Sequence, residues 1–360
     1  MVARVRLGVN LGYWGAGNDA DNLELAREAD RLGYAVVWVA EAYGSDAPTV
    51  LSWIAAQTKT VDVGSAIMQI PARTPAMTAM TAATLDTLSG GRFRLGLGVS
   101  GPQVSEGWHG VRFDAPIGRT REYVDVVRLA LSRQPVAYSG AHHVLPLPDG
   151  PGKALRLTVV PVRDRLPVYL ASLGPKNLEL TGEVADGWLG LFVSAEHVGE
   201  SLERLLAGRR TAGLDDLAGF DVCATSPLVI TPDGPEAAVV EAAADPVRGY
   251  AALYLGGMGS RTQNFYNALA RRMGYEQAAE RVQDAYLDRR PRDAAAAVPT
   301  DFVDRTSLLG PPARVADRMA ALADAGVTTL NVVPFAPDLA GRVQMLRSAA
   351  EALDASGRAG

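Results

Sequence analysis

Short apolar runs alternate with longer amphipathic stretches along nearly the whole chain, and this alternation constrains the fold more than any other feature. Residues 5–10 form the first strand-like run, and residues 21–32 follow with apolar side chains at helical spacing. Such alternation is typical of a parallel sheet covered by helices. Eight strands are expected, beginning at Val5, Val36, Val61, Phe93, Val168, Trp188, Val222 and Thr328. Eight strand–helix units predict an α/β fold, a (β/α)8 TIM barrel.

Two segments interrupt the alternation. Residues 135–167 are rich in proline and glycine and contain two β-like runs, the second at 155–160, so we expect an inserted hairpin. Residues 235–310 are mostly helical, with a strand-like run at 251–255, and we expect a helical insertion near the barrel mouth. The chain is longer than the ~250 residues at which one ordinary core stops growing. Two ordinary domains are therefore the alternative to a single barrel domain over residues 1–360.

The charge balance and composition exclude several classes of partner. The chain has 35 Lys and Arg against 40 Asp and Glu, with both signs dispersed, so we expect no nucleic-acid partner. It has no run of 18 apolar residues and no apolar signal segment near its start, so we expect no membrane span and a cytoplasmic location. The single cysteine, Cys223, excludes an internal disulfide and is expected to be a small buried hydrophobe.

Residues 96–101, Gly-Leu-Gly-Val-Ser-Gly, match the dinucleotide-binding pattern G-x-G-x-x-G after a strand. A dinucleotide site also needs a helix that opens at the third glycine, whereas the segment that follows here at 102–110 is expected to be a loop with at most one helical turn. Three strand–helix units precede the motif, although it normally follows the first strand of its fold. Two other interpretations remain, namely glycines that pack a crowded strand end and main-chain amides that approach an anionic ligand.

Three segments carry a resemblance to a known family. They are V-G-S-A-I-M-Q-I-P-A-R-T-P at 63–75, A-A-T-L-D-T-L-S-G-G-R-F-R-L-G-L-G at 82–98, and A-S-L-G-P-K at 171–176, the last followed by A-D-G-W at 185–188. Together they resemble the bacterial luciferase-like superfamily, and within it the deazaflavin (coenzyme F420)-dependent oxidoreductases. The similarity spans essentially the whole chain, and the L-D-x-L-S-G-G-R-F segment is its most specific part.

The resemblance implies a barrel whose third strand ends in a bulge against the central ring of the cofactor. Family members often have a non-prolyl cis peptide bond at this bulge, and the matching bond here joins Ala66 and Ile67. These two residues would support one face of the cofactor ring and leave the other face to the substrate. An ordinary trans strand end is the alternative.

The same resemblance assigns two groups of residues to the ribityl chain and phosphate of the cofactor. The first group follows the fourth expected strand: Ser100, Gly101, Pro102 and Gln103. The second group lies at the start of the fifth expected helix, where unpaired amides favour anions: Ser172, Gly174, Pro175 and Lys176. A solvated helix position is an equal alternative for Lys176.

Two residues are candidates for proton transfer, because barrel active sites form on loops at the carboxyl ends of the strands. Glu41 follows the second expected strand, and His109 follows the fourth. A salt bridge or a helix cap is the alternative for Glu41, and a surface position is the alternative for His109. Several deazaflavin enzymes of the superfamily have a histidine after the acidic residue, but Ala42 stands there, so the sugar-phosphate dehydrogenase mechanism of that branch is not implied. Arg73 is a candidate for binding an acidic cofactor tail or a substrate anion.

The leading hypothesis is therefore a deazaflavin (F420)-dependent oxidoreductase that moves hydride to or from a small organic substrate. An FMN-dependent monooxygenase of the same superfamily and a barrel that binds a cofactor without catalysis are the alternatives. We expect no metal site, because His142 and His143 have no third ligand spaced near them. A homodimer is expected from the superfamily alone.

Overall fold

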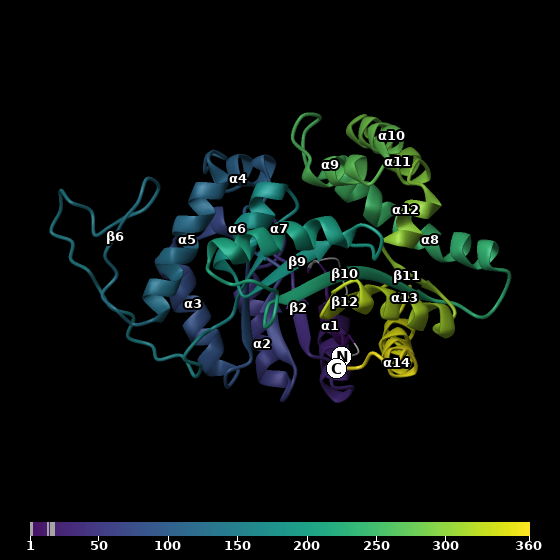
Figure 1. Ribbon diagram of the computed structural model, residues 1–360, viewed down its shortest axis with the longest axis horizontal. Helices are drawn as coiled ribbons and strands as arrows, with labels where there is room; N and C mark the ends of the chain where they lie inside the picture. The colour runs from purple at the N-terminus through teal and green to yellow at the C-terminus, as the bar shows by residue number, and fades with distance from the viewer. Residues whose placement is uncertain (1–2, 13, 15–18) are drawn as a thin grey trace.

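The computed structural model describes residues 3–12, 14 and 19–360, which form a closed ring of eight parallel strands surrounded by helices (Figure 1). The ring closes because β1 (Arg6–Asn10) pairs with both β2 (Val36–Val39) and β12 (Thr329–Pro334). The other strands of the ring are β3 (Asp62–Ser65), β5 (Phe93–Gly98), β8 (Val168–Ala171), β9 (Gly187–Leu191) and β10 (Asp221–Ile230). Each of these strands begins within one residue of its expected start, and the predicted barrel is confirmed.

Helices follow the strands and bury their apolar faces against the outside of the ring. They are α1 (Asp19–Arg31), α2 (Ala47–Gln57), α3 (Pro75–Leu88), α5 (Pro116–Leu131), α6 (Pro175–Val184), α7 (Val198–Thr211), α13 (Pro312–Asp324) and α14 (Leu339–Ala355). Four short strands lie outside the ring: β4 (Met68–Gln69) beside β5, β11 (Leu308–Gly310) beside β10, and the antiparallel pair β6 (Tyr138–Ser139) and β7 (Val144–Leu145). The short helix η1 (Ile70–Ala72) joins β4 to α3.

A group of helices packs over the carboxyl ends of β9 and β10, at the upper right of Figure 1. These helices are α8 (Glu236–Ala252), α9 (Phe265–Arg272), α10 (Glu276–Leu287), α11 (Pro291–Ala296) and α12 (Thr300–Arg305). The strand expected at 251–255 is wrong, because these residues end α8 and enter a wider helical turn, η2 (Leu253–Gly257). The side-chain amides of Asn264 and Asn267 each donate to the Leu255 carbonyl at 3.0 Å. The backbone here therefore bonds within the helical cluster and not to a strand.

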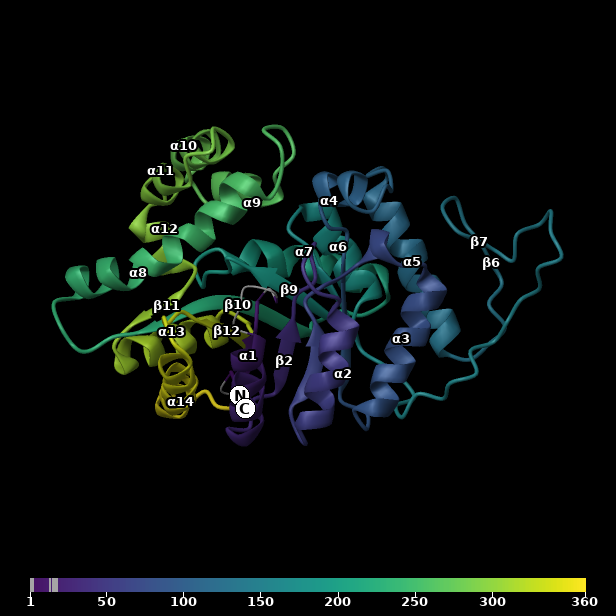
Figure 2. The ribbon, with the colours of Figure 1, turned by 180° about the vertical axis from the view of Figure 1, so that it is seen from behind.

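Residues 133–167 form an arm that projects from the side of α3 and α5, as Figures 1 and 2 show from opposite directions. Its strands β6 and β7 pair with each other, whereas residues 155–160, all of them described, form no strand. The reason lies in α5, where the Glu122 carboxylate accepts hydrogen bonds of 2.7–2.8 Å from the main-chain amides of residues 141–143. These bonds hold the tight turn between β6 and β7, whereas the second expected run makes one main-chain bond to the first, from the Val136 amide to the Leu155 carbonyl at 2.8 Å.

A charged network closes the ring at the amino ends of the strands. Arg94 of β5 pairs with Asp62 at 2.7 Å and with Asp221 at 3.1 Å, and the Tyr169 hydroxyl donates to Asp221 at 3.0 Å. Burial alone would raise the pKa of Asp221, but the nearby charges of Arg6 and Arg94 outweigh it and lower that pKa. Asp221 is therefore an ionised carboxylate inside the barrel, held there by two cations.

The glycine motif at 96–101 packs the barrel wall. A Cβ on Gly96 would lie 1.8 Å from the carbonyl oxygen of Ser65, so this position accepts no side chain. The third glycine is followed by α4 (Pro102–Gly107), a helix of six residues on a closed barrel. A dinucleotide fold needs an open sheet and a long helix at that point. The dinucleotide interpretation is therefore rejected, and the crowded-strand interpretation holds at Gly96.

Candidate active site

Small side chains line the barrel interior where the strands end. Ala66 and Ala171 lie two residues beyond Gly64 and Tyr169 on their strands, and alternating side chains along a strand point to the same face at every second residue. Both alanines pack in one interior cluster with Trp38, which is fully buried. Ala40, which follows β2, and Gly98, which ends β5, are likewise small residues at strand ends. Small side chains thus form a layer above a large aromatic ring at the mouth.

The indole of Trp38 forms a rigid floor beneath this layer. Its Nε1 donates to Oδ1 of Asn331 at 2.9 Å. Its ring meets the ring of Tyr169 edge-on, with centroids 5.3 Å apart and an angle of 74° between the planes. Gly64 makes room for the indole, because a Cβ there would lie 2.4 Å from Cζ3 of Trp38. The floor is thus fixed by a hydrogen bond, an aromatic contact and a glycine.

The bulge between β3 and β4 lies beside the mouth. The peptide bond between Ala66 and Ile67 is cis, as the resemblance implies. The Ile67 side chain crosses to β5, because a Cβ on Gly98 would lie 2.9 Å from its Cγ1 and Cδ1 atoms. Ala66 and Ile67 are both partly exposed and pack against the interior cluster that contains Trp38. The bulge therefore presents two apolar side chains at the edge of the floor.

Glu41 lies just beyond β2 and is almost completely buried. Its two oxygens accept hydrogen bonds from Nη1 and Nη2 of Arg73 at 2.8 and 2.7 Å, and from the main-chain amides of Ala47 and Gln69 at 3.2 and 3.1 Å. Burial would lower the pKa of Arg73, but its bonds to Glu41 and Asp46 outweigh burial and raise that pKa. With four donors on one carboxylate, Glu41 has the contacts of the salt-bridge alternative and not those of a free proton donor.

Gln69 connects three of the predicted site residues, two through its side chain and one through its main chain. Its Nε2 donates to Oγ of Ser100 at 3.0 Å, and its Oε1 lies 2.8 Å from Nε2 of His109. The Gln69 main-chain amide also bonds to Glu41, so three predicted residues meet around one glutamine that the sequence analysis did not select. Gln69 is buried, and it lies two residues after Ile67 in the chain. Glu41 and the pair Ser100 and His109 lie on the segments after β2 and β5, and Gln69 ends β4 between them, at the mouth.

The loop at residues 100–103 leads from β5 into α4. Ser100 has a φ of 61°, in the left-handed region that few non-glycine residues adopt. The carbonyl of Gly101 accepts the main-chain amides of residues 104 and 105 at 3.1 and 2.9 Å, and so begins α4. Pro102 is the first residue of that helix, and the Gln103 side chain is exposed. Of this predicted group, Ser100 is the residue that joins the hydrogen-bonded set around Gln69.

The second predicted group lies at the amino end of α6, which begins after Gly174. Pro175 and Lys176 are exposed there. Pro175 has no main-chain N–H, and the amides of residues 177 and 178 bond to the Gly174 carbonyl at 3.0 and 2.9 Å, so Lys176 carries the first-turn amide that faces outward. Ser172 differs from the expectation, because it is buried and its hydroxyl bonds to Oγ1 of Thr181 at 2.8 Å. The amino end of α6 therefore offers an anion the Lys176 amide and side chain, whereas the Ser172 side chain stabilises the helix.

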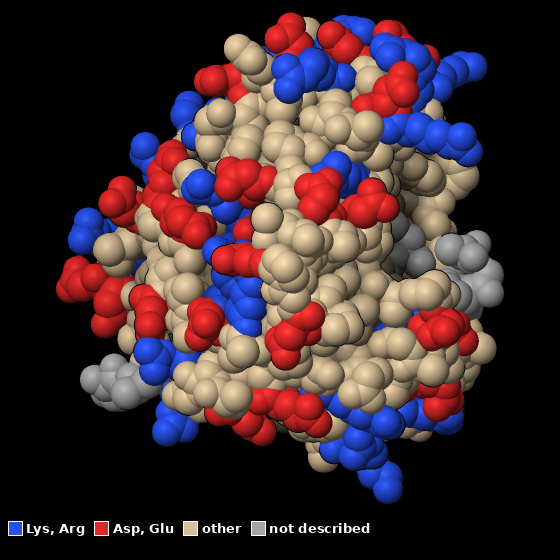
Figure 3. All heavy atoms as spheres, turned by 90° about the vertical axis from the view of Figure 1, so that its right-hand side faces the viewer, with Lys and Arg blue, Asp and Glu red and all other residues tan. Residues whose placement is uncertain are grey.

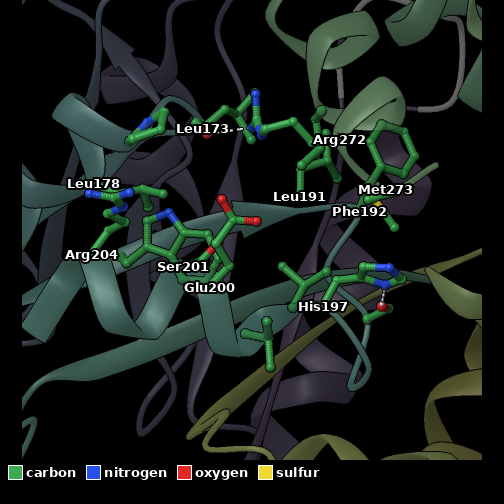
Figure 4. Close-up of a pocket in the computed structure, with 16 residues that line it drawn as sticks. Leu173, Leu178, Leu191, Phe192, His197, Glu200, Ser201, Arg204, Arg272 and Met273 are labelled. Carbon is green, nitrogen blue, oxygen red and sulfur yellow. Dashed lines mark hydrogen bonds between the residues drawn. The ribbon is translucent and has the colours of Figure 1, made fainter. Parts of the chain in front are cut away.

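Two cavities flank the mouth. One, of about 660 Å³, lies between α3, α5 and the arm, and its walls are mostly apolar. The other, of about 50 Å³, lies between α6, α7 and α9 and is drawn in Figure 4. Side chains that reach it include Leu178, Phe192, His197, Arg204 and Arg272. Nη2 of Arg272 donates to the Leu173 carbonyl at 2.9 Å, so the helical insertion is tied to the segment that leads into α6.

The barrel and the residues at its mouth belong to a known class of enzyme. A model of the luciferase-like monooxygenase family matches residues 7–329, and the chain belongs to this family of oxidoreductases. It is 43% identical over 338 residues to a protein of Mycobacterium tuberculosis that is named as a coenzyme F420-dependent oxidoreductase. That alignment covers 92% of this chain and 96% of the mycobacterial protein.

Two solved structures share the fold. The coenzyme F420-dependent tetrahydromethanopterin reductase of Methanopyrus kandleri superposes with a TM-score of 0.78 at 23% identity, over 96% of this chain and 97% of the reductase. An F420-dependent secondary alcohol dehydrogenase superposes with a TM-score of 0.76 at 19% identity, over 98% of this chain and 99% of the dehydrogenase. Among the described residues, no helix has both the length and the apolar character needed to cross a bilayer.

Proposed function

We propose that the protein is a coenzyme F420-dependent oxidoreductase that transfers hydride between the deazaflavin and a small organic substrate. The observation that carries this proposal is the mouth, where small side chains lie above Trp38 and beside the bulge at Ala66 and Ile67. A flat tricyclic ring fits such a layer. The Mycobacterium tuberculosis relative is named for the same coenzyme, which supports the assignment. A bound deazaflavin supplies two-electron hydride chemistry and reacts poorly with oxygen.

Each predicted group has a role in this proposal. Ala66 and Ile67 support one face of the ring, and the substrate occupies the other face. The loop after β5 lines the ribityl chain through Ser100, Gly101, Pro102 and Gln103. The amino end of α6 binds the phosphate through Gly174, Pro175 and Lys176, with Ser172 holding the helix in place. Phosphate suits this end of a ten-residue helix, because the open amides and the helix dipole are positive there.

We assign proton transfer to His109 and a positioning role to Glu41. Four hydrogen-bond donors already surround the Glu41 carboxylate, so protonating it would break its ion pair with Arg73. The His109 ring is only partly buried and bonds to Gln69 at the mouth. An imidazole can give or take a proton near neutral pH, which a paired carboxylate cannot do without losing its partner.

Titration of the purified protein with oxidised deazaflavin and, separately, with FMN tests the proposed function. Coenzyme fluorescence is the measurement, and we expect saturable binding of the deazaflavin with at least about tenfold weaker binding of FMN. Tight FMN binding without a response to deazaflavin would instead indicate an FMN-dependent monooxygenase. Binding of neither coenzyme would indicate a barrel that has lost its cofactor.

We further propose that two copies of the chain associate through the outer surfaces of α2 and α3. Within these two fully described helices the one charged residue is Asp86, and it is completely buried. Their exposed residues define the α2–α3 face: Thr49, Trp53, Ala56, Gln57, Ala76, Met77, Met80, Thr84, Thr87 and Leu88. Solvent-facing helices normally carry charges on their outer side. The side of the molecule in Figure 3, where basic and acidic residues intermingle, shows that ordinary pattern.

The extent of this apolar surface fits a second copy as the partner. Ten of the fifteen large hydrophobic side chains exposed among the described residues lie on α2, α3, the loop before α2 and the arm. These side chains are each 40–70% exposed. Together they present on the order of 1,000 Å², against ~800 Å² per partner in a standard protein interface. Only Trp53, Met77, Met80 and Leu88 of these ten lie on the α2–α3 face itself, so a twofold dimer of standard size also needs the arm and the loop before α2 in the interface.

The Met80→Glu variant is expected to weaken the dimer at least about 100-fold, because a carboxylate would be buried without a partner in the α2–α3 face. Size-exclusion chromatography with light scattering measures the mass of the parent chain and the variant over a range of concentrations. Leu214→Glu is the matched control, because Leu214 is another exposed large hydrophobic residue outside this face. A monomeric parent chain, or a Met80→Glu variant that stays dimeric, would contradict the proposal.

A further inference from the structure

We propose that Gln69 is a positioning residue that holds His109 in the tautomer with a proton on Nε2, so that Nδ1 is the atom that exchanges a proton with the substrate. The proposal rests on the proposed function for the role of His109, and on the described contacts of Gln69 for the geometry. Gln69 is polar, is only 3% exposed and lies in the short strand that follows the cis bulge. Burying a polar side chain costs free energy unless it makes hydrogen bonds, so we expect the hydrogen bonds of Gln69 to serve a purpose at this position.

The two ends of the Gln69 amide determine the tautomer. Its Nε2 donates to Oγ of Ser100 at 3.0 Å, and its amide oxygen faces His109. That oxygen lies 2.8 Å from Nε2 of the imidazole. A carbonyl oxygen can only accept, so the hydrogen of this bond belongs to the imidazole Nε2. In the neutral ring the other nitrogen, Nδ1, then carries the lone pair.

The backbone of Gln69 is fixed on both sides. Its main-chain amide donates to Glu41 at 3.1 Å, and Glu41 is itself held by both terminal nitrogens of Arg73. On the other side, Gln69 pairs with Gly98 of β5 in the sheet register. The position of the Gln69 amide is therefore fixed before any ligand binds. Efficient proton transfer requires groups that are held in place in this way.

Two groups become available to a ligand as a result. Among the described residues, Nδ1 of His109 has no hydrogen-bond partner, whereas Nε2 is engaged by Gln69. Ser100 accepts the bond from Gln69, so its own hydroxyl hydrogen is left to donate. For every hydride that the substrate gains from the coenzyme, the protonated ring gives one proton from Nδ1, and in the reverse direction Nδ1 takes one proton back. A hydrogen-bond acceptor on the substrate therefore belongs beside Nδ1.

The test uses ¹⁵N-histidine labelling and long-range ¹H–¹⁵N correlation spectra of the cofactor-free protein at a pH where the ring is neutral. The chain has four histidines, and a His109→Ala variant assigns the relevant signals. We expect the His109 ring of the parent chain to be protonated on Nε2 alone. In Gln69→Leu the ring is expected to populate both tautomers, and kcat with the deazaflavin is expected to fall about tenfold or more.

The Gln69→Glu variant gives a second readout that a merely structural residue would not change. A carboxylate next to Nε2 favours the charged imidazolium, so the pH at which the His109 ring takes its second proton rises by about one unit or more. The pH profile of kcat is expected to move by the same amount. Gln283→Leu is the matched control, because Gln283 is also buried and donates to a main-chain carbonyl, that of Ser260, at 3.1 Å.

The outcomes separate the positioning role from the proposed function. An unchanged tautomer and pH profile in the Gln69 variants, with a loss of stability like that in Gln283→Leu, would overturn the positioning role. Because the spectra need no coenzyme, the expected tautomer in a protein that binds no deazaflavin would leave the positioning role intact and reject the proposed function. If Gln69→Leu does not fold, Gln69→Asn tests the same point, because its shorter amide cannot reach both Ser100 and His109.

Discussion

The Ala171→Trp variant is expected to bind the deazaflavin at least about 100-fold more weakly than the parent chain. Ala171 ends β8 in the layer of small side chains at the mouth, and it packs in the same interior cluster as Trp38 and Ile67. An indole at this position would fill the space above the floor that we assign to the coenzyme ring. The strand would keep its hydrogen bonds, since Ala171 is partly exposed and the added ring can extend into the mouth. Fluorescence titration with oxidised deazaflavin measures the loss.

Ala355→Trp is the control for this variant. Ala355 is an exposed residue at the end of α14, so the same substitution there adds an indole to solvent and should leave binding unchanged. Circular dichroism of both variants verifies that the barrel is folded. Parent-like affinity in a folded Ala171→Trp protein would show that the coenzyme ring does not lie in the mouth layer.

The second large effect is a loss of stability when the charged network at the amino ends of the strands is broken. We expect Asp221→Ala to lower the free energy of unfolding by about 3–5 kcal/mol, because it leaves the buried Arg94 without one of its partners. Urea denaturation at neutral pH measures this loss. Arg165→Ala is the control, since Arg165 is exposed in its ion pair with Asp186 and should cost about 1 kcal/mol or less. A loss in Asp221→Ala no larger than that in Arg165→Ala would contradict the assigned role of the network.

The Asp221 carboxylate is also expected to make the stability of the folded chain depend on pH. Burial raises the pKa of Asp221, but Arg6 and Arg94 outweigh burial, so its pKa in the folded chain is lower than in the unfolded chain. The stabilisation is therefore fully present above the unfolded value, ~4, and is lost as the pH falls through the lower folded value. Asp221→Asn removes this titration. We expect the stability of that variant to change less between pH 5 and pH 3 than the stability of the parent chain, as measured by urea denaturation.

The eight strands of the ring could be predicted because each is a buried apolar run that ends before a helix with a clear start or stop signal. Local patterns did not predict the pairing of the arm, since it depends on Glu122 of α5, a residue distant in sequence from the second strand that it selects. The run at 251–255 has the composition of a strand, yet tertiary contacts with Asn264 and Asn267 keep it helical. The failures therefore arise where long-range hydrogen bonds override local preference.

The candidate site, like the fold, could be predicted only in part. The cis bond at Ala66 could be predicted from the resemblance, because the bulge has a recognisable local sequence. The ion pair of Glu41 could not, because its partner Arg73 is 32 residues away and no spacing rule links a strand end to a later helix start. Gln69 gave no signal at all, since one glutamine within an apolar segment looks like an ordinary surface residue until its three hydrogen bonds are seen.

The charged network at the amino ends of the strands also has a kinetic consequence. Arg94, Tyr169 and Asp221 block the ring from below, and the indole of Trp38 fills its middle. Among the described residues, the amino end of the ring is therefore closed, and the mouth is the route into the barrel. The coenzyme and the substrate of the proposed reaction would therefore both enter and leave through the mouth.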